Sequence, residues 1–378
     1  MPHIETLLAQ SGCEEDPGTG ALVAPIHLST TFIRDTDGTY PRGFSYSRDN
    51  NPTRKQFEET LAQIEGGDIC SAFSSGMAAV MTVFQALKPG DHVILPDDVY
   101  HGVRHLAHSI FQDWGLEFSL VDLSNLEALE SALKPSTALI WIETPSNPLL
   151  KITDIASVVD QARRVDAQIL VDGAWTTPLL QQPLALGATL VLHSVTKYLA
   201  GHSDVLGGAI IGKDTNPLMG RIQQIQKAGG AVMDPFSAWL SLRGMRSLSA
   251  RIKLQCENAR KIADFLNEYD LIETVHHPSL TSHPGHDIAG KQMTDFGAMI
   301  SIEVKGSADF AKAIANNTQI FKQATSLGGT ESLIEHRASI EAPPTKTPQT
   351  LLRLSVGLEN INDLLADLEQ AISKSVNR

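Results

Sequence analysis

Short runs of apolar and β-branched residues alternate with longer amphipathic segments from about residue 68 to residue 193. The short runs are typical of buried strands, and the longer segments repeat apolar residues at helical spacing. Strands that alternate with helices predict a mostly parallel β-sheet with helices on its faces. The expected strands are 92–95, 117–121, 139–143, 168–171 and 188–193, and the expected helices are 77–87, 125–133 and 154–165.

The pattern changes on both sides of this region. Residues 1–50 have weak periodicity and many turn-forming residues, so we expect an extended arm that lies on another surface. A helix should follow, because Asn51 and Pro52 form a strong helix start. A long helical region over 235–269 precedes a mixed order of strands (298–304 and 351–355) and helices (from 308 and from 360). We therefore predict an arm (1–50), a large α/β domain (51–245) and a small α+β domain (246–378).

Composition narrows the class of protein. The 378 residues are 42% hydrophobic and 19% charged, as in a globular enzyme, and the formal net charge of −13 argues against a nucleic-acid binder. No apolar run approaches the length of a membrane span. The cysteines Cys13, Cys70 and Cys256 are far apart and form no CxxC pair, so we expect free thiols in a reducing compartment, the cytoplasm, and no metal site.

The first candidate for chemistry is Lys197. It follows the apolar run 188–193 on a turn that also carries Ser194 and Thr196. A lysine at a buried strand end can have a desolvated amine that acts as a nucleophile, which is what a pyridoxal phosphate (PLP) enzyme requires to form a Schiff base with its cofactor. A structural lysine at the junction of strand and loop explains this segment equally well.

Polar residues also follow the other expected strands. Ligands of parallel sheets bind beyond the carboxyl ends of the strands, so these residues should converge on one site. Asp172 directly follows the buried run 169–171, and a carboxylate there suits the protonated ring nitrogen of PLP. The residues that follow the strands are Asp97, Asp98, Tyr100, Glu143, Asn147, Asp172, Ser194, Thr196 and Lys197.

Two further segments have features typical of sites that bind anionic groups. The turn Ser74-Ser75-Gly76 opens an expected helix, whose free backbone N–H groups and positive dipole end favour a phosphate. Arg353 lies within the apolar run 351–356, where a buried guanidinium needs an anionic partner. That partner is either a substrate carboxylate or an acidic side chain in a structural salt bridge, and the sequence favours neither.

Three histidines, His101, His105 and His108, have helical spacing. They lack the glutamate of H-E-x-x-H and any nearby cysteine, so we interpret them as a partly exposed helix face rather than a metal site. The chain also lacks the glycine-rich motifs for dinucleotides and for nucleoside triphosphates.

Seven ordered motifs, taken together, resemble the Cys/Met metabolism PLP-dependent enzymes, the group of cystathionine γ-synthase, cystathionine γ-lyase, cystathionine β-lyase and methionine γ-lyase. They cover nearly the whole chain, so chance resemblance is remote. The motifs are Tyr46-Ser47-Arg48 with Asn51-Pro52-Thr53-Arg54, Ser74-Ser75-Gly76-Met77-Ala78-Ala79, Glu143-Thr144-Pro145-Ser146-Asn147-Pro148, His193-Ser194-Val195-Thr196-Lys197-Tyr198, Gly201-His202-Ser203-Asp204, Ser326-Leu327-Gly328-Gly329 with Glu331-Ser332-Leu333, and Leu352-Arg353-Leu354-Ser355-Val356-Gly357.

The resemblance implies a fold-type I PLP enzyme, a homotetramer built from dimers with shared active sites. It implies that Lys197 is the Schiff-base lysine, that Asp172 pairs with the ring nitrogen, and that Tyr100 stacks on the ring and transfers protons. Gly76, Met77, Ser194 and Thr196 would hold the phosphate, joined by Tyr46 and Arg48 from the neighbouring subunit. The substrate carboxylate would be held by Asn147, which also lies near the ring oxygen, by the Ser326 segment with Thr325, and by Arg353.

The resemblance implies γ-elimination or γ-replacement on a γ-substituted amino acid derived from homoserine or homocysteine. Elimination releases 2-oxobutanoate and ammonia, whereas replacement attaches a new nucleophile, and the same residues serve both. Weaker alternatives are a cystathionine β-lyase and a γ-lyase for methionine or canavanine. From another class, a PLP-binding protein without turnover is a remote alternative.

Several residues depart from the family pattern. Thr325 stands where members that handle cystathionine often have glutamate, which weakens binding of a distal ammonium group and slightly favours a lyase over a synthase. Gly173-Ala174-Trp175 replaces Asn-Thr-Phe, and His101 interrupts a usual Gly-Gly pair. Arg337 and Glu341 replace a usual proline and threonine, and we expect them to reshape the distal pocket for another γ-substituent.

Overall fold

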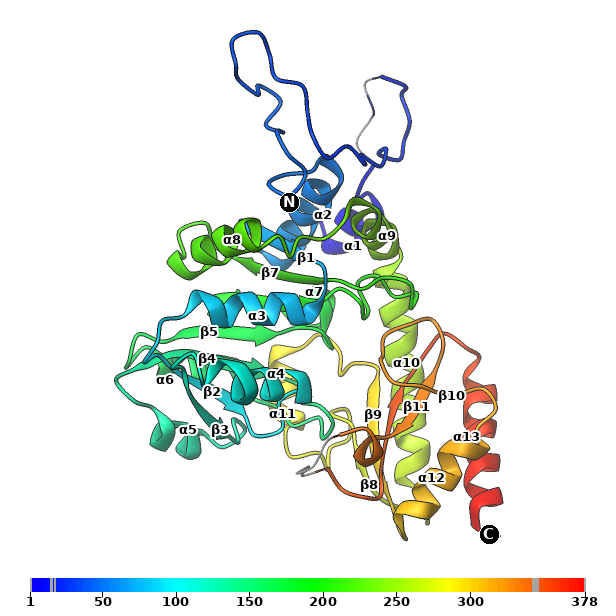
Figure 1. Cartoon of the computed structure of the whole chain (residues 1–378). Helices are drawn as coiled ribbons and strands as arrows, with labels where there is room; N and C mark the ends of the chain where they lie inside the picture. The colour runs from blue at the N-terminus through cyan, green and yellow to red at the C-terminus, as the bar shows by residue number, and fades with distance from the viewer. Residues whose placement is uncertain (1, 14–15, 17, 342–346, 377–378) are drawn as a thin grey trace.

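The computed structural model describes residues 2–13, 16, 18–341 and 347–376 (Figure 1). The α-helices are α1 (Ile4–Ala9), α2 (Pro52–Glu65), α3 (Gly76–Ala86), α4 (His101–Leu106), α5 (Leu126–Ala132), α6 (Ile155–Ala162), α7 (Thr177–Leu180), α8 (Pro217–Gly229), α9 (Pro235–Met245), α10 (Leu248–Asn267), α11 (His286–Gln292), α12 (Ala308–Asn317) and α13 (Ile361–Val376). The strands are β1 (Ile69–Phe73), β2 (His92–Pro96), β3 (Glu117–Val121), β4 (Thr137–Glu143), β5 (Gln168–Asp172), β6 (Leu190–Ser194), β7 (Gly208–Gly212), β8 (Ile272–His276), β9 (Met299–Val304), β10 (Lys322–Gln323), β11 (Leu333–His336) and β12 (Leu351–Ser355).

The larger sheet has seven strands in the order β1-β7-β6-β5-β4-β2-β3. Strands β6, β5, β4, β2 and β3 run parallel, whereas β7 is antiparallel to both β6 and β1. Alternate residues of β4 serve opposite faces: Leu139 and Trp141 pack with α3, α4 and α8, while Ile140 and Ile142 pack with α5 and α6. This arrangement confirms the predicted parallel sheet, in which both faces are covered by helices.

The smaller sheet has five strands in the order β10-β11-β12-β9-β8 and is antiparallel except for the short β10–β11 pair. Helices α12 and α13 pack on each other, and α10 contacts α13, β8 and β9. The mixed α+β order that we predicted for this part of the chain is therefore confirmed. One apolar cluster joins the two sheets, because Val195 and Leu199 beside β6 belong to the same core as Ala259 of α10 and Ile300 of β9.

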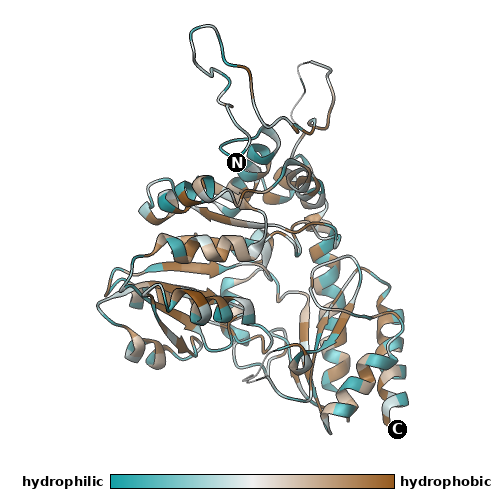
Figure 2. Ribbon diagram, viewed as in Figure 1, coloured by the Kyte–Doolittle hydropathy of each residue, from teal (hydrophilic) through white to brown (hydrophobic). Residues whose placement is uncertain are grey.

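The hydropathy-coloured view shows brown strands inside and teal on the outer helix surfaces (Figure 2). Among the helices that the structure describes, none has a stretch long and apolar enough to cross a membrane.

The arm extends away from the rest of the chain as two loops that project beyond α1 and α2 (Figure 1). Several of its apolar side chains are exposed, among them Leu22, Leu28 and, at 88%, Ile33. Its end is held firmly, since the buried Arg54 of α2 donates to the backbone oxygens of Ser47 (2.9 Å) and Arg48 (3.2 Å). As expected, Asn51 caps α2, accepting from the backbone N–H groups of residues 53 and 54.

A close contact between β7 and the start of α3 gives a testable prediction. A Cβ at Gly208 would lie 2.4 Å from the backbone oxygen of Ser75 and 2.7 Å from the Cα of Gly76. Because these are backbone atoms, we expect Gly208→Ala to displace the start of α3 and to lower the free energy of unfolding by about 1–3 kcal/mol, measured by urea denaturation. The control is Gly220→Ala in α8, where no atom lies within 4 Å of the added Cβ. The control should not destabilise the protein, and equal midpoints for Gly208→Ala and wild type would contradict the prediction.

Candidate active site

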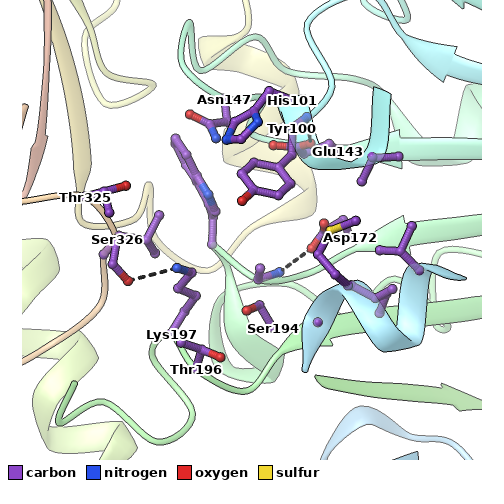
Figure 3. A pocket seen from close by; sticks show the side chains of 18 of the residues that line it. Tyr100, His101, Glu143, Asn147, Asp172, Ser194, Thr196, Lys197, Thr325 and Ser326 are labelled. Carbon is purple, nitrogen blue, oxygen red and sulfur yellow. Dashed lines mark hydrogen bonds between the residues drawn. The ribbon is translucent and has the colours of Figure 1, made fainter. Parts of the chain in front are cut away.

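A cavity of about 210 Å³ lies at the carboxyl ends of the parallel strands, where segments of both sheets meet (Figure 3). It collects residues that are far apart in the sequence, as the strand-end rule predicts. Of the predicted site residues, it is lined by Gly76, Met77, Tyr100, Asn147, Asp172, Ser194, Thr196, Lys197, Thr325, Ser326 and Arg353.

Lys197 follows β6 and extends its amine into this cavity, where Nζ donates to Oγ of Ser326 at 2.8 Å (Figure 3). Burial and, next, the nearby cation Arg353 together lower the pKa of Lys197 to about 8. A larger share of this amine is therefore neutral at physiological pH than for an exposed lysine. A neutral amine is the form that attacks an aldehyde or accepts a proton from carbon.

Asp172 ends β5 directly beside Glu143 at the end of β4. Burial raises the pKa of Asp172 to about 6, while a hydrogen bond from the backbone N–H of Ala174 (3.0 Å) and the charge of His193 act in the opposite direction. His193 is itself buried, and its Nε2 lies 2.8 Å from Oε2 of Glu65. A carboxylate in this position suits a protonated ring nitrogen, which would stabilise its charged form.

Glu143 positions the backbone of Tyr100 at the cavity. Its Oε2 accepts a hydrogen bond from the backbone N–H of Tyr100 at 2.9 Å, which fixes the start of α4 at the cavity. Burial, with the carboxylate of Asp172 nearby, raises the pKa of Glu143 well above its usual range. Both effects favour the neutral form of the Glu143 carboxyl group.

The start of α3 forms an anion cradle. Ser75 caps the helix by accepting from the backbone N–H of Ala78 at 3.0 Å, and Gly76 and Met77 of the first turn line the cavity. The first N–H groups of a helix lack partners within the helix, so a helix start favours an anion. A Cβ at Gly76 would lie 3.3 Å from Oγ of Ser194, so glycine keeps this space open. Thr196 borders the same space, its hydroxyl held by the backbone of Gly207. These features fit a phosphate.

Tyr100 and His101 form the opposite wall of the cavity (Figure 3). Their ring centroids are 4.5 Å apart. A Cβ at Gly102 would lie 2.6 Å from Cε1 of Tyr100, so the glycine after His101 permits the position of the tyrosine ring. The interpretation as a partly exposed helix face holds for all three histidines, since His101 is partly exposed and His105 and His108 are exposed. His101 also lines the cavity, because α4 begins there.

The structural salt bridge, one of the two alternatives for Arg353, is present in the structure, whereas the role of Arg353 toward a substrate carboxylate stays a prediction. Its guanidinium lines the cavity and donates to Oδ1 of Asn147 (2.9 Å) and to the backbone oxygen of Ser326 (3.2 Å), and it also forms an ion pair with Glu335. The sequence analysis missed Glu335. A charged residue within an apolar run is the signal that identified Arg353 in 351–355, and Glu335 in 333–336 has the same signal. In the structure, β11 and β12 pair Glu335 with Arg353.

Tyr46 and Arg48 lie outside the cavity of their own chain. The Arg48 guanidinium lies over the Tyr46 ring, 5.5 Å from its centroid, and both side chains are about half exposed.

Comparison with known proteins agrees with this geometry. The model of the family described as Cys/Met metabolism PLP-dependent enzymes matches residues 5–373. A cystathionine gamma-synthase of Mycobacterium tuberculosis (strain ATCC 25618 / H37Rv) is 45% identical over 97% of this chain and 96% of its own length. A cystathionine gamma-lyase of Dictyostelium discoideum is 43% identical over 98% of both chains. The crystal structure of cystathionine gamma synthase from Xanthomonas oryzae pv. oryzae in complex with aminoacrylate and cysteine superposes with a TM-score of 0.96 and 39% identity, covering 100% of this chain and 99% of that one.

The environment of Lys197 predicts its reactivity in the cofactor-free protein. We expect an amine-directed acylating reagent to modify Lys197 with an apparent pKa of about 8, measured by mass spectrometry as a function of pH. Lys151 is the internal control, because ion pairs with Asp97 and Asp122 raise the pKa of its amine. In Arg353→Met, the pKa of Lys197 should rise because a neighbouring cation is lost. Equal pH profiles for Lys197 and Lys151 would contradict the prediction.

Proposed function

We propose a substrate and a reaction for this chain, which belongs to the family of Cys/Met metabolism PLP-dependent enzymes. The substrate is an ester of L-homoserine, and the reaction is γ-replacement, in which a thiol such as that of cysteine takes the place of the γ-oxygen substituent. γ-Elimination from the same substrate is the second candidate, because the same residues serve both outcomes.

The neutral Thr325 in the cavity wall is the observation that carries the choice of substrate, although by itself it slightly favours a lyase over a synthase. Cystathionine has an ammonium group at its far end, for which a carboxylate at this position would be the natural partner. An ester of homoserine with a simple acyl group has no such charge, so a hydroxyl side chain suits it better. The choice of replacement over elimination rests instead on the similarity to proteins named cystathionine gamma-synthase, although the lyases are nearly as similar.

The residues of the cavity fit PLP, and its parts have separate places. The start of α3 with Ser194 and Thr196 would hold the phosphate, Asp172 the ring nitrogen and Lys197 the aldehyde, while Tyr100 would contact the ring. When bound, PLP withdraws electrons from the α-carbon of the substrate and so makes its protons acidic.

The other roles belong to the side chains. Arg353 and Asn147, already joined by a hydrogen bond, would hold the substrate carboxylate and so orient the α-carbon toward Lys197. The Lys197 amine would accept the Cα proton. Ser326, which accepts a hydrogen bond from this amine, would direct the amine toward the next carbon. The Tyr100 hydroxyl would donate a proton to the leaving oxygen.

We further propose that the active protein is a dimer-based homotetramer, in which Tyr46 and Arg48 complete the phosphate site of a neighbouring subunit. Both residues are outside their own cavity, and buried Arg54 fixes the backbone that carries them. The exposed apolar residues of the arm suit contact with another copy of the chain. The three cysteines are free thiols, which supports a location in the cytoplasm.

The reaction is tested by incubating the PLP-loaded protein with an acyl ester of homoserine, with and without cysteine. We expect a thioether product with cysteine, slower release of 2-oxobutanoate without it, and loss of both in Lys197→Ala. Cystathionine alone should release 2-oxobutanoate more slowly than the ester does. Faster release from cystathionine would assign a lyase, pyruvate would assign a β-lyase, and a cofactor-bound protein inert toward every substrate would leave only PLP binding.

The shared site is tested by mixing two inactive variants, Lys197→Ala and Arg48→Ala. In a mixed dimer with shared sites, one site carries both substitutions and the other carries neither. We therefore expect activity to return after subunit exchange, measured as turnover of the ester. If Arg48 served the cavity of its own chain, every site would keep one substitution, and no activity would return.

A further inference from the structure

We propose that the buried pair of Glu65 and His193 keeps the carboxylate of Asp172 ionised for the ring nitrogen of PLP. His193 acts through Asp172 and is therefore a positioning residue rather than a catalytic one. The inference rests on the proposed function and deepens it, because it starts from the placement of the ring nitrogen at Asp172.

His193 lies beside the cavity without forming part of its wall. In β6 it stands between Leu192 and Ser194, which both line the cavity. Successive side chains of a strand point to opposite faces, so the imidazole lies on the far side of β6. Only 2% of its side chain is exposed. A direct contact between His193 and a substrate is therefore not expected.

The imidazole packs against the backbone that follows Asp172. The parallel strands β5 and β6 pair Asp172 with Leu192, and the backbone N–H of Gly173 donates to the backbone oxygen of Leu192 at 2.8 Å. A Cβ at Gly173 would lie 2.7 Å from Cε1 of His193 and 3.3 Å from each of its ring nitrogens. Glycine, which stands where asparagine is usual in the family, therefore provides the space that the imidazole occupies.

Glu65 supplies a countercharge for the imidazole. It is the last residue of α2, its side chain is fully buried, and its Oε2 lies 2.8 Å from Nε2 of His193. Its Oε1 has no hydrogen-bond partner among the residues that the structure describes. A buried carboxylate is costly unless a proton or a cation balances its charge. We therefore expect Glu65 and His193 to hold one proton between them.

A proton on the imidazole favours the charged form of Asp172. Burial raises the pKa of Asp172, whereas the backbone N–H of Ala174 lowers it. The charges of His193 and, to a lesser extent, Lys197 also lower it. The Lys197 amine is assigned to the cofactor aldehyde, but His193 takes no part in that bond and can keep its charge. Glu143 also lies beside Asp172, at the end of β4, but an acid cannot supply a positive charge.

A link between α2 and β6 does not by itself require a histidine. An amide side chain at position 193 could also donate a hydrogen bond to Glu65. An imidazole differs from an amide because it can hold a positive charge near neutral pH. The second ring nitrogen of His193, Nδ1, is buried and has no hydrogen-bond partner in the described part of the chain. A purely structural link would leave this cost unexplained.

A cofactor analogue without the ring nitrogen tests the inference. In 1-deaza-PLP, a carbon atom replaces that nitrogen, and the phosphate and the aldehyde are unchanged. Dissociation constants are measured by tryptophan fluorescence, since Trp175 lines the cavity. We expect wild type to prefer PLP, and His193→Gln to reduce the preference roughly 10-fold through the loss of a neighbouring charge. Glu65→Gln should act in the same direction, because an imidazole beside a neutral amide holds its proton less readily.

A double-mutant cycle and a matched control separate this route from a structural effect. In the Asp172→Asn background, where the preference for PLP should already be lost, His193→Gln should not change it further. The control is His92→Gln, at the amino end of β2 in the same sheet. His92 is also fully buried, but its ring nitrogens lie 2.9 Å from the hydroxyls of Thr137 and Ser119. This control should keep the preference, and unfolding midpoints establish that each variant is folded.

The outcomes separate this inference from the proposed function. If wild type binds PLP and the analogue equally, Asp172 does not pair with the ring nitrogen, and the proposed placement of the cofactor fails. If Asp172→Asn loses the preference while His193→Gln and Glu65→Gln retain it, the inference alone fails. Equal weakening of both compounds in His193→Gln would assign the pair a structural role and overturn the inference. An equal loss of preference in His92→Gln would overturn it too, because the effect would not be specific to the neighbour of Asp172.

Discussion

Burial of the Lys197 amine is the constraint on which the rest of the site depends. A lysine at the end of a buried strand loses hydration, which lowers the pKa of its amine to about 8. Its one described hydrogen bond, to Ser326, comes from a segment more than a hundred residues away. The amine therefore has its reactive environment only when the large and small sheets are assembled around it. The shared apolar core beside β6 supplies the stability for this arrangement.

The same assembly creates the substrate end of the site. Arg353 belongs to β12 of the small sheet, but its hydrogen bond to Asn147 reaches the loop after β4 of the large sheet. A second link lies nearby, because the hydroxyl of Ser301 in β9 donates to the backbone oxygen of Pro148 at 2.6 Å. The proposed recognition of the substrate carboxylate thus depends on the contact between the two sheets, and we expect a change in that contact to alter both stability and substrate binding.

Local sequence patterns predicted the residues at the carboxyl ends of parallel strands, because strand periodicity and the strand-end rule need no long-range information. Asp172, Tyr100 and Lys197 were found in this way, and Arg353 was found as a charge within an apolar run. The motif resemblance assigned their roles and added the Ser326 segment with Thr325. The pairing of Glu335 with Arg353 was not predictable, since it depends on the register of β11 and β12. Strands β1 and β7 were also missed, and the helical region 235–269 divides into α9 and α10 after Met245. The roles of Tyr46 and Arg48 stay a prediction, because they require a second copy of the chain.

The most direct test of the account is chemical mapping of the cofactor attachment. The PLP-loaded protein is treated with borohydride, which reduces an imine between the cofactor and a lysine to a stable secondary amine. The protein is then digested and analysed by mass spectrometry. The account predicts the cofactor-derived mass on the peptide that contains Lys197, at close to one per chain, and nowhere else. Attachment at a different lysine, or none at all in a protein that has bound PLP, would contradict it.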